Sequence, residues 1–127
     1  MGGLALDGGR LFVGATDHKL YALNAATGQP LWEPIVTGDW IVATPAVWRG
    51  LLIFGSNDGH LYMADAAQGK ILWRFPAGGA VQAQPAVTTE GLVVVGTSAG
   101  AIYGLPWHLR NYVDAATWLE GQRGGEA

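Results

Sequence analysis

An all-β fold built from repeated four-stranded units is predicted by three features of the sequence. Residues 11–32 recur as residues 52–73 at a spacing of 41, and a shortened third copy follows at the same spacing. The copies consist of short apolar and β-branched runs, separated by turns rich in Gly and Asp. A fixed period of about 40 residues in strand-type sequence is typical of propeller blades. We therefore expect a partial β-propeller of about three four-stranded antiparallel blades, the last incomplete, followed by a short C-terminal α-helix.

The recurrence retains the same residue types at matching positions. In the first copy these are Gly14, Asp17, Leu20, Tyr21, Ala25, Ala26, Gly28, Leu31 and Trp32, and in the second Gly55, Asp58, Leu61, Tyr62, Ala66, Ala67, Gly69, Leu72 and Trp73. The third copy keeps Gly96, Ile102 and Tyr103, although Pro85 follows Pro45 at a spacing of 40. One residue is lost before Pro85 and one is gained in the turn at 88–91. Since both changes fall in turns, the strands keep their register.

Each copy divides into strand-like runs. In the second copy they span residues 42–48, 51–56, 60–64 and 70–75. Between the middle two, Asn57-Asp58-Gly59 predicts a tight hairpin, because Asp-Gly tolerates the positive φ angles of a type I′ turn. The first copy opens with a strand at residues 4–6, and the third copy opens at residues 84–87.

The predicted domain comprises residues 1–106. Its blades cover about 3–36, about 42–77 and, for the partial third blade, about 82–106. The third blade stops after three strands, because Pro106 stands where the repeat predicts the Asp of the next turn.

Residues 107–127 form a separate helical tail in this prediction. Leu109, Tyr112, Ala116 and Leu119 have the spacing of one helix face. Two interpretations stay open: a lone helix that caps the third blade, and the start of a helical repeat region that resembles the tetratricopeptide kind.

The third and fourth strands of the first two copies resemble the pyrroloquinoline-quinone-type (PQQ-like) propeller repeat, roughly Leu-Tyr-Ala-Leu-Asp-Ala-x-Thr-Gly-x-x-Leu-Trp. The matching runs are 20–32 and 61–73, and the resemblance covers about residues 3–106. It implies structural roles in docking one blade on the next. Trp32 and Trp73 would stack on peptide planes of the neighbouring blade, near the glycines of the motif, and Asn24 and Asp65 would brace the turns that end in Gly28 and Gly69. A WD-repeat assignment is disfavoured, because the Trp-Asp dipeptide that ends that repeat is missing.

Three blades are too few to surround an axis, since propellers have about 4 to 8. The outer faces of the first and last blades would then remain apolar and exposed. Two arrangements remove this exposure: the chain belongs to a longer propeller, or two copies assemble as a homodimer that closes a six-bladed ring.

Composition excludes several function classes. Seven Lys and Arg against ten Asp and Glu, with no cluster of either sign, disfavour nucleic acid and anionic membranes as partners. The absence of Cys excludes disulfides and thiolate metal sites. The N-terminal residues do not form a signal peptide, and no apolar run reaches the roughly 20 residues of a membrane span. We expect a soluble chain with no indication of its compartment.

An enzyme must be considered, because the PQQ-like family includes quinoprotein dehydrogenases. The resemblance implies that such enzymes hold a quinone and a calcium ion on the propeller axis, through carboxylates and amides beside a catalytic Asp. Here the strands nearest the axis offer only Thr44 and Gln84, whereas Asp17 and Asp58 occupy hairpin turns. We therefore expect no catalytic residue, cofactor or metal, although a fragment of a quinoprotein dehydrogenase-like enzyme remains the alternative.

The function predicted instead is that of a non-catalytic binding or scaffold module that mediates protein–protein interaction within a larger propeller protein. Trp40 is the first candidate contact, because it stands on a polar Gly-Asp loop. Thr44 and Gln84, which precede Pro45 and Pro85, are the next. A self-assembling partial propeller is a further alternative.

Overall fold

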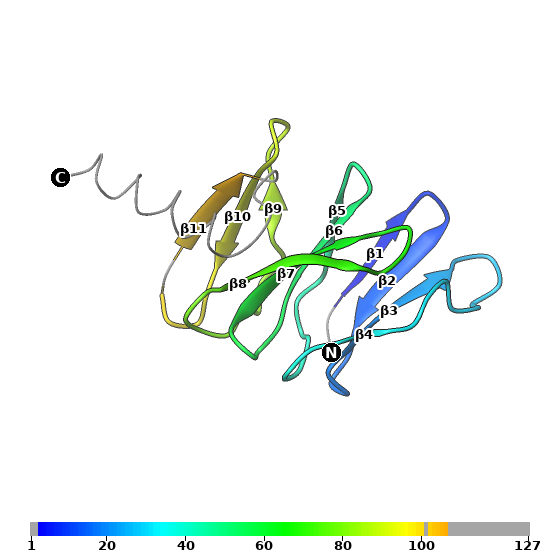
Figure 1. Cartoon of the computed structure of the whole chain (residues 1–127), viewed down its shortest axis with the longest axis horizontal. Helices are drawn as coiled ribbons and strands as arrows, with labels where there is room; N and C mark the ends of the chain where they lie inside the picture. Colours follow the sequence, from blue (N-terminus) through cyan, green and yellow to red (C-terminus); the bar gives the residue numbers. More distant parts are fainter. Residues whose placement is uncertain (1–2, 101, 107–127) are drawn as a thin grey trace.

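The computed structural model of this chain describes residues 3–100 and 102–106 (Figure 1). Over these residues the chain forms three consecutive antiparallel sheets, in the strand orders β1-β2-β3-β4, β5-β6-β7-β8 and β11-β10-β9. The predicted all-β architecture of two complete blades and a three-stranded third is therefore confirmed. The predicted C-terminal helix within residues 107–127 lies outside the described residues.

The strand bounds follow the repeat. Blade 1 contains β1 (Leu4–Asp7), β2 (Arg10–Gly14), β3 (Lys19–Asn24) and β4 (Ile35–Val36). Blade 2 contains β5 (Ala46–Trp48), β6 (Leu51–Gly55), β7 (His60–Asp65) and β8 (Ile71–Pro76). Blade 3 contains β9 (Ala86–Val87), β10 (Leu92–Gly96) and β11 (Ile102–Pro106).

The three sheets lie side by side, with their first strands next to one another (Figure 1). Strand β1 packs against β5, and β5 packs against β9. This arrangement is that of adjacent blades around a common axis, in which the first strand of each blade lies innermost.

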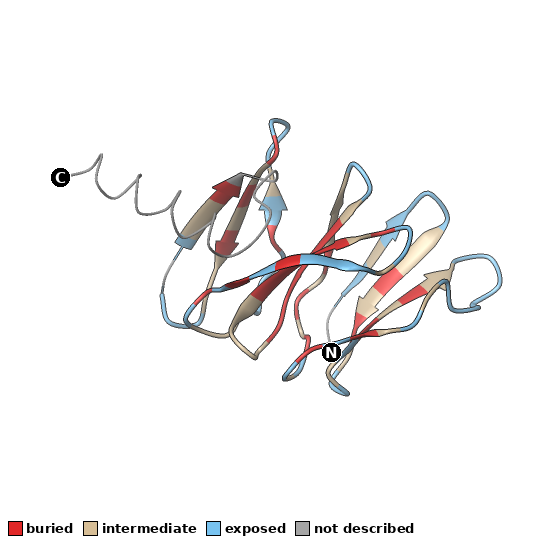
Figure 2. Ribbon diagram, in the orientation of Figure 1, coloured by how far each residue is buried: buried red, intermediate tan, exposed pale blue. Residues whose placement is uncertain are grey.

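The hydrophobic cores lie between blades. One core joins blade 1 to blade 2 and includes Phe12 and Phe54, both fully buried. The other joins blade 2 to blade 3 and includes Ile53 and Val93, also fully buried. Because neighbouring residues of a strand point to opposite faces, β6 contributes Ile53 to one core and Phe54 to the other. Blade 2 consequently has more buried residues than either neighbouring blade (Figure 2).

The glycines that end β2 and β6 allow the next blade to approach. A Cβ atom on Gly55 would lie 2.1 Å from Cγ1 of Val81 and 3.0 Å from the Val81 carbonyl oxygen. Gly14 has the same relation to Ile41. Both Ile41 and Val81 are fully buried, and they lie on the linkers that carry the chain into the following blade. The recurring Gly is therefore a packing requirement of the interface between blades.

Two local predictions are corrected. The first strand of blade 2 is shorter than the predicted residues 42–48, because it begins only at Ala46. The preceding residues belong to a linker that crosses blade 1, where the Ile41 N–H donates to the Ala15 carbonyl oxygen at 3.2 Å. Pro45 has no N–H to extend the ladder.

The hairpin at Asn57-Asp58-Gly59 is not a type I′ turn. Only Gly59 has a positive φ there, of 88°, and its N–H donates to the Ser56 carbonyl oxygen at 3.2 Å. Two-residue turns with both central φ angles positive occur instead between β1 and β2 and between β5 and β6, where Arg49 and Gly50 have φ of 48° and 77°.

Gly55→Ala is expected to destabilise the chain by about 1–3 kcal/mol, because the new methyl group overlaps Val81 in a closely packed interface. The matched control is Gly104→Ala, whose Cβ would lie 3.6 Å from Cδ2 of Leu92, an ordinary contact. That change should alter stability by no more than about 0.5 kcal/mol. Urea unfolding followed by tryptophan fluorescence compares the two, and equal losses would contradict the packing argument.

Candidate functional site

The linker between β4 and β5 is anchored by a buried pair of hydroxyl groups. The Oγ1 atom of Thr37 lies 3.0 Å from Oγ of Ser56, and both residues are buried. Thr37 also donates to the carbonyl oxygen of Asp39 at 2.8 Å. Because Ser56 belongs to blade 2, these contacts attach the linker to the blade it enters.

Trp40 is presented by this anchored linker. Its N–H donates to Oδ1 of Asp39 at 2.7 Å, and its carbonyl oxygen accepts from the Asn57 N–H at 2.8 Å. Its side chain nevertheless remains 50% exposed. The backbone is thus held in place from both sides while the indole faces solvent.

The second linker repeats this path with a smaller side chain. Ala80 takes the place of Trp40, at the spacing of 40 that also relates Pro85 to Pro45. The Ala80 carbonyl oxygen accepts from the Ser98 N–H at 2.9 Å, as the Trp40 carbonyl does from Asn57. The indole of Trp40 is therefore not needed to direct the linker.

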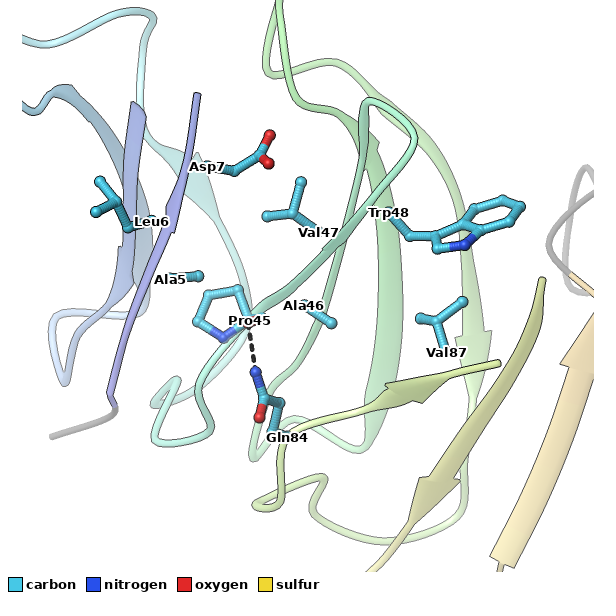
Figure 3. Close-up of a pocket in the computed structure, with 9 residues that line it drawn as sticks. All are labelled: Ala5, Leu6, Asp7, Pro45, Ala46, Val47, Trp48, Gln84 and Val87. Atoms are coloured by element: carbon cyan, nitrogen blue, oxygen red, sulfur yellow. Dashed lines mark hydrogen bonds between the residues drawn. The ribbon is translucent and has the colours of Figure 1, made fainter. Parts of the chain in front are cut away.

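A hollow of about 340 Å³ lies between the innermost strands (Figure 3). Its lining is Ala5, Leu6, Asp7, Pro45, Ala46, Val47, Trp48, Gln84 and Val87. Gln84, a predicted contact residue, donates from Nε2 to the Pro45 carbonyl oxygen at 3.0 Å, so it joins blade 3 to blade 2 (Figure 3). Thr44, the other residue predicted here, packs against Gly3, where a Cβ would lie 2.2 Å from its Oγ1. The structure does not bring Trp40 to this hollow, since it is not part of the lining.

Asp58 does more than brace a turn. Its Oδ1 accepts from the His60 N–H at 2.9 Å, as a turn residue would. Its Oδ2 also accepts from the Tyr62 hydroxyl and, at 2.9 Å, from the N–H of Gly38 on the linker from blade 1. One carboxylate therefore joins a hairpin, a strand and the preceding blade.

These contacts shift the acidity of the pair. Burial raises the pKa of Asp58, whereas the hydrogen bonds from Tyr62, Gly38 and His60 lower it. The hydrogen bonds outweigh burial, so the net shift of the pKa is downward. Burial, together with the bond to the Asp58 carboxylate, raises the pKa of Tyr62. The carboxylate is thus stabilised in its ionised form.

Sequence reasoning missed this role, although the signal was present. Asp17 and Tyr21 recur as Asp58 and Tyr62 at the same internal spacing, and a lone turn residue would not need the tyrosine. In the first copy Asp17 accepts from Tyr21 and from the Lys19 N–H at 3.1 Å. The hydrogen bond from Tyr21 lowers the pKa of Asp17.

The residues assigned to blade docking lie at the interface of blades 1 and 2. Trp32 donates from Nε1 to the Ala66 carbonyl oxygen at 3.0 Å. A Cβ on Gly69 would lie 2.3 Å from Cδ2 of Trp32, so the indole lies directly on this glycine. Asp65 accepts through Oδ1 from the Ala67 N–H at 2.8 Å, which fixes the turn that carries Gly69.

The same turn in blade 1 has the same geometry. Asn24 accepts through Oδ1 from the Ala26 N–H at 2.9 Å, and Gly28 has φ of 74° against 70° for Gly69. Trp73 is buried, and its Nε1 has no hydrogen-bond partner among the residues the structure describes. The blade 3 positions that would receive its indole follow Pro106 and lie outside those residues.

Two features are absent from residues 3–100 and 102–106, the part of the chain that the structure describes. No three His, Cys, Asp or Glu side chains there converge as metal ligands would. No helix in those ranges has the length and apolar character of a membrane span.

Asp58→Asn is expected to lower the free energy of unfolding at pH 7 by about 1 kcal/mol, because the Gly38 and Tyr62 donors lose a charged acceptor. The pKa of Asp58 is lower in the folded protein than in the unfolded chain. The contribution of Asp58 to the free energy of unfolding is therefore fully present above the unfolded pKa of about 3.9, and it is lost as the pH falls through the folded pKa.

The difference between wild type and Asp58→Asn should therefore shrink at acidic pH, as measured by urea unfolding at pH 7 and pH 3. Asp17→Asn is the control and should have the smaller effect, because Asp17 has no donor from a preceding blade within the described structure. A difference that stays constant with pH would contradict this assignment.

Comparison with known proteins identifies the repeat. The sequence model of the family described as outer membrane protein assembly factor BamB matches residues 1–107. No curated protein matches the chain. The crystal structure of BamB from Moraxella catarrhalis is similar with a TM-score of 0.72 and 18% identity, over 86% of this chain and 32% of that one.

Two computationally designed proteins are also similar. Ika8 has a TM-score of 0.73 and 22% identity, over 82% of this chain and 32% of its own. Ika4 has a TM-score of 0.69 and 23% identity, over 81% of this chain and 63% of its own. The chain thus spans about a third of BamB and Ika8 and less than two thirds of Ika4. At these identities the likeness shows the fold alone, but the family match covers most of the chain and confirms the PQQ-like repeat. This chain belongs to the family described as outer membrane protein assembly factor BamB.

Proposed function

We propose that this chain is a non-catalytic module of a larger propeller and that it binds a protein partner through Trp40. The observation that carries the proposal is a half-exposed indole on a linker whose backbone is fixed at Trp40 by hydrogen bonds to Asp39 and to Asn57 of the next blade. Tryptophan is among the residue types that contribute most to the energy of protein interfaces.

The rigidity of the loop favours binding. Ordering a flexible loop reduces affinity, whereas a preorganised one avoids that cost. Here the buried contact between Thr37 and Ser56 and the bonds of Trp40 to Asp39 and Asn57 already order the backbone. A partner would need to restrict only the indole.

The fold itself gives no reason for an indole at this position. Ala80 serves the same linker path in the next repeat, with the same backbone bond to the following blade. A large apolar side chain that is half exposed and dispensable for the backbone is a candidate for recognition.

The surface beside Trp40 provides a polar border. A hollow of about 370 Å³ lies at the β6–β7 hairpin and the second linker, and Asn57, Asp58 and His60 line it. The Asn57 N–H also donates to the Trp40 carbonyl oxygen, so one backbone hydrogen bond links the Trp40 loop to a residue that lines the hollow. An aromatic anchor next to polar groups has the composition of a protein interface.

The family description supports a partner that is a protein. It names an assembly factor for outer membrane proteins, and for this chain we take from it only the expectation of a protein partner. The larger propeller is supported by the length of BamB, of which this chain covers 32%.

Trp40→Ala should leave the melting temperature unchanged within about 2 °C and should abolish capture of the partner. The control is Leu72→Ala, which removes a side chain of similar exposure, 46%, from strand β8. Capture from cells that contain the native protein, quantified by mass spectrometry for wild type and both variants, tests this. Equal capture by wild type and Trp40→Ala would refute the proposal.

The non-catalytic part of the proposal has its own test. Titration with pyrroloquinoline quinone and calcium should change neither the quinone absorbance nor the melting temperature of the chain. A saturable shift in either would favour the alternative, a fragment of a quinoprotein dehydrogenase-like enzyme.

A further inference from the structure

The chain itself holds a guanidinium group between an aromatic ring and a carboxylate. The Cζ atom of Arg10 lies 5.6 Å from the centroid of the Phe12 ring. The same guanidinium donates to Oδ2 of Asp7 at 3.1 Å. The negative face of an aromatic ring attracts the cation, and the carboxylate adds a charge-assisted hydrogen bond. These three residues are therefore an internal template for the recognition of an arginine.

Asp39 and Trp40 supply the same two chemical groups on the linker from β4 to β5. Oδ1 of Asp39 accepts from the Trp40 N–H at 2.7 Å. This bond keeps the carboxylate beside residue 40, although neighbouring side chains of an extended chain point apart.

Both groups are available to a partner. Oδ2 of Asp39 makes no hydrogen bond or ion pair with the residues that the structure describes. The Trp40 side chain is 50% exposed, and within the same part of the chain no guanidinium or second aromatic ring is paired with it. A carboxylate oxygen and an indole thus lie next to each other at the surface.

The next repeat has neither group. Gly79 and Ala80 take the places of Asp39 and Trp40, at the linker spacing of 40. There the Ala80 N–H donates to Oγ of Ser98 at 3.0 Å, so the backbone donor can be satisfied without an acidic residue. The combination of acid and indole is therefore not a requirement of the linker path.

The loops around Trp40 are acidic. At this end of the blades the chain forms three hairpins and two linkers, which contain Asp17, Asp39 and Asp58 but no Lys or Arg. Their described residues are 15–18, 37–45, 56–59, 77–85 and 97–100. Lys19 borders the first hairpin, where it lies opposite Val36 in the ladder. The resulting potential favours a cationic partner group.

We propose that the protein partner presents an arginine to Asp39 and Trp40, with its guanidinium over the indole and in contact with Oδ2 of Asp39. The proposal rests on the proposed function and names the chemistry of the partner surface. Tryptophan is the aromatic side chain that binds cations best. A guanidinium suits such a site better than the ammonium of lysine, because it is planar and more weakly hydrated.

Three short peptides measure this preference. The probe is acetyl-Ser-Gly-Arg-Gly-Ser-amide, and the two comparison peptides carry citrulline or lysine in place of arginine. Citrulline has nearly the shape of arginine but no charge. Each peptide is titrated at constant ionic strength into the ¹⁵N-labelled chain of 127 residues. The indole N–H resonance of Trp40, assigned by its loss in Trp40→Phe, reports binding.

The arginine peptide should shift the Trp40 resonance saturably. It should bind about five-fold more tightly than the citrulline peptide and about two-fold more tightly than the lysine peptide. Equal binding of the arginine and citrulline peptides would overturn the proposal. Equal binding of the arginine and lysine peptides would overturn the assignment to a guanidinium.

Asp39→Asn tests the carboxylate separately from the indole. Asparagine retains an Oδ1 acceptor for the Trp40 N–H, so the melting temperature should stay within about 2 °C. The arginine peptide should nevertheless bind about three-fold more weakly, because the ion pair is lost. The matched control is Glu90→Gln, which makes the same change of charge in the β9–β10 turn, at the opposite end of the blades. Equal effects of the two variants on peptide binding would overturn the role of Asp39.

The capture experiment with Asp39→Asn separates this proposal from the proposed function. If Trp40→Ala abolishes capture and Asp39→Asn leaves it unchanged, the partner contacts the indole through other chemistry. The proposed function then stands and the partner arginine is refuted. Equal capture by wild type and Trp40→Ala refutes the proposed function and the partner arginine together, whatever the peptides show.

Discussion

The structure depends on contacts between blades, because a four-stranded sheet with two apolar faces buries neither face alone. Phe54 and Ile53 are consecutive residues of one strand, yet each belongs to the core shared with a different neighbour. The close approach at Gly55 and Val81 and the indole of Trp32 on Gly69 serve the same requirement. Each blade is therefore stabilised by the next, as in other repeat proteins.

Polar groups determine which surfaces meet, in addition to this apolar packing. The carboxylate of Asp58 accepts from its own hairpin, from Tyr62 and from the preceding linker, so the relative position of two blades is set at one side chain. The hydroxyls of Thr37 and Ser56 act nearby on the same linker. Because these groups order the linker that carries Trp40, the contacts that hold the blades together also position the proposed recognition residue.

Comparison of repeats within the chain separates structural residues from candidates for function. A residue with the same contacts in two copies, such as Asn24 and Asp65, is explained by the blade. Trp40 has no such counterpart, since the equivalent residue is Ala80 and the backbone path is unchanged.

The blade count, the strand order and the role of the recurring turns could be predicted from the sequence, because period and turn chemistry are local properties. The late start of β5 could not, because it depends on where the linker crosses a neighbouring blade. The type I′ turn at Arg49-Gly50 was missed because Arg is not among the residue types that mark a positive φ. Likewise the sequence determined that Asp17 and Asp58 occupy turns. Only the tertiary structure decided that Asp58 receives the Gly38 N–H, whereas Asp17 has no such donor among the described residues, because that bond exists only where the linker of one blade packs on the hairpin of the next.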